Sequence, residues 1–81
     1  MNKSDIMEKL TRIFRENFDD DSIELSEMST WDDVEGWDSL EHIKLIVAIQ
    51  DEFQLQFNIE EMESMKSVGD MVRVISEKFR E

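Results

Sequence analysis

The sequence contains no cysteine, no proline and only two glycines, Gly36 and Gly69. Without cysteine the chain can form no disulfide, no thiolate metal site and no cysteine nucleophile. Without proline, and with so little glycine, few positions interrupt a helix and no flexible linker divides the chain. A length of 81 residues therefore predicts one domain over residues 1–81 with a small core.

Basic residues are also scarce. The chain has 9 lysines and arginines against 21 acidic residues, which gives a formal net charge of −12. This charge disfavours binding to nucleic acid or anionic lipid and favours a partner with a basic surface. Because no apolar run is long enough for a secretory signal or a membrane span, we expect a cytoplasmic protein that does not insert into a membrane. We also expect a monomer that does not bind nucleic acid.

The spacing of apolar residues predicts a first helix over about 4–18. Asn2 or Ser4 can serve as its N-cap. One face of this helix carries the apolar residues Ile6, Leu10, Ile13 and Phe14, followed one turn later by Phe18.

A second helix is expected to begin at Asp38 or Ser39 and to end near Phe53. Asp38 can cap its backbone N–H groups, and Glu41 stands at the spacing that completes an acidic version of a capping box. At 100° per residue, one face of this helix forms a core stripe of Leu45, Ile46, Ile49 and Phe53.

Two more helices are indicated by pairs at the spacing of a capping box. Asn58 and Glu61 mark a short third helix, and Ser67 and Asp70 mark a fourth. We expect the fourth helix to bury Val68, Met71, Val72, Ile75 and Phe79. The predicted fold class is all-α, a small four-helix bundle of three main helices and one short third helix.

A long acidic loop is expected between the first two helices. No lysine or arginine occurs from Glu16 to Ile43. Apolar residues without a sustained period suggest that the loop is pinned to the bundle at several points: Ile23, Leu25, Met28, Trp31 and Val34. We expect Trp31 to be an anchor in the core rather than a platform for a ligand.

The second helix carries a second apolar strip, formed by Leu40, Ile43 and Val47, on the side roughly opposite its core stripe. Such a helix is either sandwiched in a core or exposed on one side. Because so small a domain has little material to cover both sides, we favour an exposed strip that binds partners.

The stretch Gly36-Trp37-Asp38-Ser39-Leu40, followed by a helix reading EHIKLIVAIQDEF, resembles the acyl carrier protein family, whose hallmark is Asp-Ser-Leu at the start of the second helix. The resemblance extends over nearly the whole chain and is strongest from Gly36 to Phe79. It includes Trp31 eight residues before the serine, the pair Glu52-Phe53, and the stretch FNIEEMESMKSVGDMVRVI.

The resemblance implies that Ser39 carries 4′-phosphopantetheine, donated by coenzyme A through a phosphopantetheinyl transferase. The arm would supply the thiol that the chain lacks and hold an acyl or aminoacyl group as a thioester. The protein would then be a carrier and not an enzyme, serving an acyl-loading ligase or synthase and acyl-transfer enzymes with basic surfaces. The expected partner-binding residues are Asp38, Leu40, Glu41, Ile43, Lys44, Val47 and Asp51.

Departures from the family pattern leave the pathway open. Glu35 stands where many members have leucine, and Lys44 and Gln50 replace common acids. With Trp37 and His42 the chain resembles carriers of polyketide-like, aminoacyl or glycan-modifying pathways more than fatty-acid carriers. We expect a freestanding carrier.

His42 and Trp37 each have a structural and a functional interpretation. His42 shares a helical face with Ile46 and Ile49, which favours a hydrogen-bonded residue at the edge of the core. Trp37 is either a wedge that packs the loop on the bundle or part of a surface that selects partners.

Three other functions were considered. The acidic loop fails the calcium-loop pattern, because Ile23 and Glu24 occupy the fifth and sixth positions when counting starts at Asp19. A serine hydrolase is disfavoured because no G-x-S-x-G elbow is present. An acidic helical adaptor that binds a basic partner without being modified would need the same acids and the same strip, so it stays open.

Overall fold

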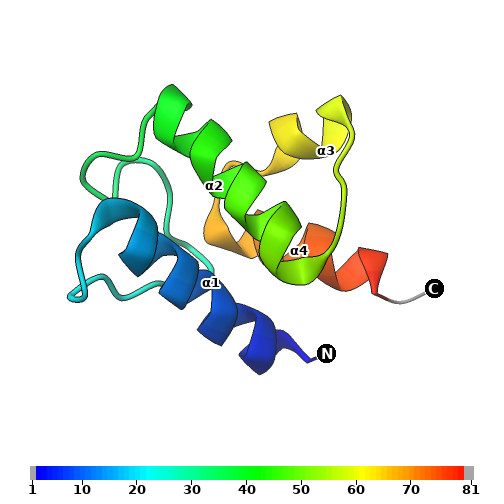
Figure 1. The fold of residues 1–81 in the computed structure, drawn as a ribbon, viewed down its shortest axis with the longest axis horizontal. Coiled ribbons are helices and arrows are strands. Elements are labelled where there is room, and N and C mark those ends of the chain that lie inside the picture. The colour runs from blue at the N-terminus through cyan, green and yellow to red at the C-terminus, as the bar shows by residue number, and fades with distance from the viewer. Residues whose placement is uncertain (1, 80–81) are drawn as a thin grey trace.

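The computed structural model describes residues 2–79, which contain four α-helices: α1 (Lys3–Phe18), α2 (Ser39–Phe53), α3 (Ile59–Ser64) and α4 (Val68–Lys78). Figure 1 shows α1 and α2 running in opposite directions, with the long loop joining them at one end of the molecule. No strand occurs in residues 2–79, where only an isolated antiparallel bridge pairs Thr30 with Ser67. The all-α prediction is confirmed.

Each helix begins at a polar cap whose side chain accepts a hydrogen bond from the backbone N–H three residues later, as the sequence predicted. The caps are Asn2, Asp38, Asn58 and Ser67. At α3 the capping box is complete, because the Glu61 carboxylate also accepts from the Asn58 N–H at 2.9 Å. These bonds satisfy backbone donors that have no partner within the helix.

The predicted capping box of α2 is wrong in its second half. Glu41 does not turn back to the cap; its carboxylate accepts from Asn17 Nδ2 on α1 at 2.9 Å and pairs with Lys44 Nζ at 3.2 Å. A donor on the neighbouring helix competes with the local bond, and sequence spacing alone does not reveal such a donor.

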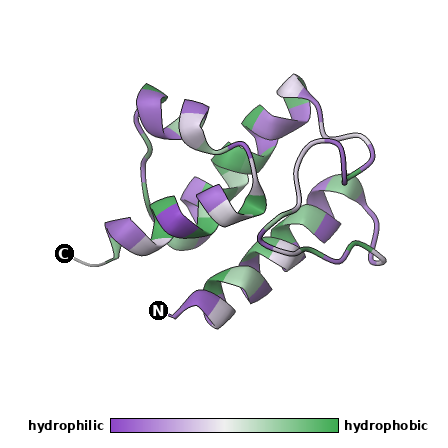
Figure 2. Ribbon diagram, turned by 180° about the vertical axis from the view of Figure 1, so that it is seen from behind, coloured by the Kyte–Doolittle hydropathy of each residue, from purple (hydrophilic) through white to green (hydrophobic). Residues whose placement is uncertain are grey.

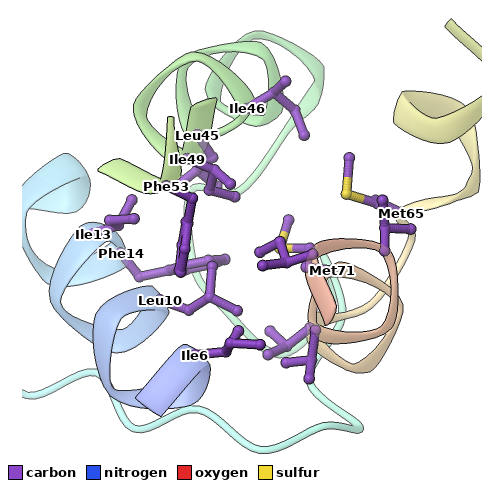
Figure 3. Packing of buried hydrophobic residues seen from close by; sticks show 14 of the residues in the cluster. Ile6, Leu10, Ile13, Phe14, Leu45, Ile46, Ile49, Phe53, Met65 and Met71 are labelled. Carbon is purple, nitrogen blue, oxygen red and sulfur yellow. The ribbon is translucent and has the colours of Figure 1, made fainter. Parts of the chain in front are cut away.

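The core lies between the facing sides of α1, α2 and α4 (Figure 3). Leu10 and Phe14 of α1 point toward Leu45 and Ile49 of α2, and Met71 of α4 approaches from the third side. The hydropathy colouring in Figure 2 shows apolar positions on the inner helix faces and polar ones on many outer faces. The stripes predicted for α1 and α2 are buried: Ile6, Leu10, Ile13, Phe14, Leu45, Ile46, Ile49 and Phe53.

The α4 prediction needs three corrections. The capping box of Ser67 and Asp70 is incomplete, because the Asp70 carboxylate accepts from the Lys66 N–H at 3.1 Å and not from that of Ser67. Phe79 is exposed rather than buried, because α4 ends at Lys78 and the Phe79 ring only reaches the rim of the core, 6.3 Å from the Phe53 ring centre. Val74 is also buried, although it was not among the residues predicted for the core face of this helix. The remaining predicted residues are in the core: Val68, Met71, Val72 and Ile75.

The long loop is attached to the bundle at several points, as predicted, through apolar side chains and through its backbone. Val34 is buried, and Ile23 and Leu25 pack against the core, whereas Met28 is 85% exposed and is not an attachment point.

The N–H groups of Val68 and Gly69, at the start of α4, donate to the carbonyls of Ser29 (2.9 Å) and Glu27 (2.8 Å). Arg15 Nε of α1 donates to the Ile23 carbonyl at 2.8 Å. Helix ends thus supply the donors that hold an irregular segment in place.

We predict that Gly69→Ala destabilises the fold although alanine is the better helix former. An alanine Cβ at this position would lie 2.7 Å from the Glu27 carbonyl oxygen. Helix propensity alone would favour alanine by about 1 kcal/mol, but relieving the clash requires the loop to move. We expect a net loss of about 1–3 kcal/mol in the free energy of unfolding, measured by urea denaturation.

The matched control is Glu77→Ala, an exposed position of the same helix, where we expect a change within about 0.5 kcal/mol. A stabilised Gly69→Ala variant would contradict the close approach of the loop to α4.

Candidate functional site

Ser39 is the first residue of α2, and it is exposed. Its position follows from Gly36, whose φ of +88° turns the chain toward the helix, and from Asp38, which caps the helix with an extended backbone. A φ in this range is strained for residues with a side chain. Local turn chemistry therefore presents the serine hydroxyl to solvent at the helix start.

The start of α2 suits a covalently attached phosphodiester. The first N–H groups of a helix have no intrahelical acceptor, and the helix dipole places positive charge there. The Asp38 side chain takes up the N–H of Glu41 at 2.9 Å, which leaves those of Ser39 and Leu40 without an intrahelical acceptor. The residues present fit a phosphopantetheine attached at the serine.

An apolar strip follows the serine along the outer side of α2. Leu40, Ile43 and Val47 expose 61%, 62% and 50% of their surface, whereas the neighbouring core residue Ile46 exposes 4%. Positions three and four apart share a helix face, so these three side chains form one strip. The structure therefore favours the exposed strip over the sandwiched helix.

Charged residues flank this strip. Asp38, Lys44 and Asp51 are exposed, and Glu41 is half-buried through its bonds to Asn17 and Lys44. All seven residues that the sequence assigned to partner binding thus lie on α2 or at its cap, and six of them are exposed. Their role in binding stays a prediction.

Trp37, His42 and Trp31 form an aromatic cluster one turn from Ser39. Trp37 exposes 3% of its surface, and its ring meets the Phe14 ring edge-on at 5.0 Å between centres. Its Nε1–H donates to His42 Nδ1 at 3.2 Å. Trp37 is therefore the wedge that packs the loop on the bundle, and His42 is the hydrogen-bonded residue at the core edge that the sequence predicted.

The prediction that Trp31 anchors the core is wrong. Trp31 exposes 39% of its surface and lies against the outer side of the cluster, 5.3 Å from the His42 ring centre and 6.3 Å from that of Trp37. The buried anchors from this loop are Val34 and Trp37. The sequence offered one signal for the cluster, which is that the only histidine and both tryptophans lie within twelve residues of one another.

Burial lowers the pKa of His42 below its ordinary value of 6.5, although a hydrogen bond with the Met62 backbone opposes the shift. Because Nδ1 accepts from Trp37, the ring proton of neutral His42 belongs on Nε2, where it can face the Met62 carbonyl of α3. The histidine thus connects the loop, α2 and α3 in its neutral form.

Residues 2–79 contain neither a metal-binding cluster nor a membrane-spanning helix. No group of three or more His, Asp or Glu side chains in this part of the chain is arranged to hold a metal ion. None of the helices described is both long enough and apolar enough to cross a membrane.

Comparisons with known proteins point to one family. Residues 8–75 match the sequence model of the family described as "Phosphopantetheine attachment site". The chain is 35% identical over 75 residues to an acyl carrier protein of Caulobacter vibrioides, covering 93% of this chain and 96% of that one. It is 36% identical over 70 residues to an acyl carrier protein of Clostridium acetobutylicum, covering 86% and 91%.

A solved structure agrees with these sequence matches. The solution structure of holo acyl carrier protein from Geobacter metallireducens has a TM-score of 0.83 and 38% identity, covering 90% of this chain and 84% of that one. The helical arrangement described above is therefore also that of a carrier solved in its holo form.

We predict that His42 makes stability depend on pH. The pKa of His42 is lower in the folded chain than its ordinary value of 6.5. The imidazole therefore takes up its second ring proton more readily in the unfolded chain. The stability that neutral His42 contributes is complete above about pH 6.5 and is lost as the pH falls through the folded pKa. Between about pH 7.5 and about pH 5.5, we expect urea unfolding to show a larger loss for wild type than for His42→Gln.

Glutamine is the matched control because its carbonyl oxygen can still accept from Trp37. Carboxylates titrate in both proteins, so the difference isolates His42. Equal losses, or a ring titration by NMR at or above pH 6.5, would contradict the burial of the neutral ring.

Proposed function

Because this chain belongs to the acyl carrier protein family of phosphopantetheine-binding proteins, we propose that Ser39 is the residue to which its prosthetic group is attached. The protein is an acyl carrier, and its cofactor is covalently bound 4′-phosphopantetheine. The observation that carries the assignment of Ser39 is an exposed serine hydroxyl at the N-terminus of α2, immediately before the exposed apolar strip.

Ser39 and its neighbours have different roles in the proposed attachment site. Ser39 would supply the hydroxyl oxygen of the phosphodiester, and the N–H groups at the start of α2 would favour its negative charge. The thiol of the bound arm holds the acyl group as a thioester. Asp38 keeps the helix start in place through its cap of Glu41. The chain itself performs no bond chemistry in this assignment.

The partners of the family are phosphopantetheinyl transferases and biosynthetic enzymes. For this chain we propose that they have basic surfaces and that they dock on the strip of Leu40, Ile43 and Val47. The net charge of −12 and the exposed carboxylates of Asp38 and Asp51 support this, since complementary charge steers encounter and orients the partner. A monomeric state, a place in the cytoplasm and the nature of the acyl group stay predictions.

The unmodified adaptor gains no support from the comparisons, whose matches are a phosphopantetheine attachment family and acyl carrier proteins. The modification state of Ser39 is the property that distinguishes the two functions.

We predict that the purified chain gains the mass of one phosphopantetheinyl group when it is incubated with coenzyme A and a broad-specificity transferase. The hydroxyl is exposed and lies at a helix N-terminus, so it should be accessible. Intact-mass measurement and peptide mapping should place the group on Ser39, and Ser39→Ala should gain none. The absence of any mass gain with several transferases would overturn the assignment and favour the adaptor.

We also predict that Ile43→Asp slows the transferase reaction at least about tenfold, a loss of about 1.4 kcal/mol of transition-state binding, while leaving the melting temperature nearly unchanged. Ile43 exposes 62% of its surface, so the charge enters the proposed contact and not the core.

Two variants serve as controls. Ile46→Asp, on the same helix but 4% exposed, should unfold the protein, because it buries an unpaired charge. Met28→Asp, which changes an exposed loop residue, should affect neither melting nor modification. A large loss of stability in Ile43→Asp would show that the strip is core.

A further inference from the structure

A pocket of about 300 Å³ lies on the outside of the bundle, lined by Thr30, Trp31, Asp32 and Lys66. It is formed where the long loop passes the segment between α3 and α4. Four larger hollows, of about 350 to about 560 Å³, are lined mostly by polar and charged side chains. The Trp31 pocket differs from them in having an indole wall.

The aromatic wall packs on a ring close to Ser39 in the sequence. Trp31 contacts His42 with 5.3 Å between ring centres, and His42 is itself fixed by the Trp37 hydrogen bond. His42 stands three residues after Ser39, a spacing that puts two side chains on the same side of a helix. The indole is therefore about one helical turn and one ring contact away from the serine.

The pocket is also lined by a cation, Lys66, for which no ion pair occurs among the described residues. Each of the other lysines forms an ion pair with a carboxylate: Lys3, Lys9, Lys44 and Lys78. An unpaired ammonium can donate up to three hydrogen bonds. In a chain of net charge −12, this lysine lines the pocket beside the indole and Asp32 without forming an ion pair.

From this arrangement we propose that the Trp31 pocket is the resting site of the pantetheine portion of the prosthetic arm. The inference rests on attachment at Ser39. The pantetheine chain has geminal methyl groups that suit the indole face, amide N–H groups that suit an aromatic π-system, and amide carbonyls that can accept from Lys66.

Tethering makes so shallow a pocket sufficient. At about 300 Å³ the pocket is at the small end of the range for ligand sites, and a free ligand would bind it weakly. A group attached one turn away has an effective concentration on the order of millimolar. The rigid indole adds no ordering cost of its own. The pocket can therefore retain the arm between partners and still release it to them.

The test uses NMR on the isotopically labelled full chain, converted from apo to holo form by a transferase and coenzyme A. The chain has two tryptophans and hence two indole N–H signals, which Trp31→Phe assigns. We expect the Trp31 signal to shift on conversion and the Trp31 ring protons to show nuclear Overhauser effects to the geminal methyl protons of the arm. The buried Trp37 ring should show no Overhauser effects to the arm. In Lys66→Ala, the Overhauser effects between the arm and Trp31 should be weaker.

The outcomes separate this inference from the proposed function. Complete mass conversion at Ser39, with an unchanged Trp31 signal and no Overhauser effects, would overturn the pocket and leave the carrier function intact. Overhauser effects from the geminal methyl groups to Ile43 and Val47 would place the arm along α2. That result would also overturn the assignment of the Trp31 pocket. No mass gain at Ser39 would overturn both proposals.

Discussion

The burial of Leu45 and Ile49 against α1 and α4 is the constraint on which the rest of the structure depends. It fixes the rotation of α2 about its own axis, because side chains at 100° intervals cannot be turned independently. With Leu45, Ile46 and Ile49 inward, Leu40, Ile43 and Val47 have to face outward. The same rotation determines on which side of α2 the Ser39 side chain lies. The core that stabilises this domain therefore also determines the orientation of the exposed strip, which is the proposed docking surface.

Backbone hydrogen bonds give the long loop its shape, and the shape of the loop gives the site its aromatic neighbours. The carbonyls of Glu27 and Ser29 take up two N–H groups at the start of α4, so the loop is held a few residues before Trp31. Three residues after Trp31 the loop enters the core at Val34, and Trp37 follows. Trp31 lies between these fixed points and can pack only on the outer side of His42. The exposed indole is thus a consequence of where the loop is anchored.

The features that the sequence predicted well are local ones. Helix periods and N-caps depend on residues within one or two turns, and Asn2, Asp38, Asn58 and Ser67 all act as expected. Several of the errors concern features that helix spacing does not encode. Glu41 bonds to Asn17 across 24 positions, Trp31 lies outside the core while Trp37 is buried in it, and Phe79 lies beyond the end of α4. Spacing says nothing about which of two tryptophans a core of this size will admit.

Trp37 and His42 also bear on the question of pathway. The sequence suggested that this pair resembles carriers of specialised pathways, yet the structure gives both residues a structural task. Trp37 fills the core beside Phe14, and its Nε1–H donates to the His42 ring. The His42 ring in turn contacts the Met62 backbone of α3. Neither residue is among the strongly exposed side chains of α2. The exposed apolar side chains near the start of α2 are instead Trp31 on the loop and the strip of Leu40, Ile43 and Val47. On the proposal that partners dock on the strip, substitutions in it would alter the choice of partner, while the inner pair would keep the start of α2 in place.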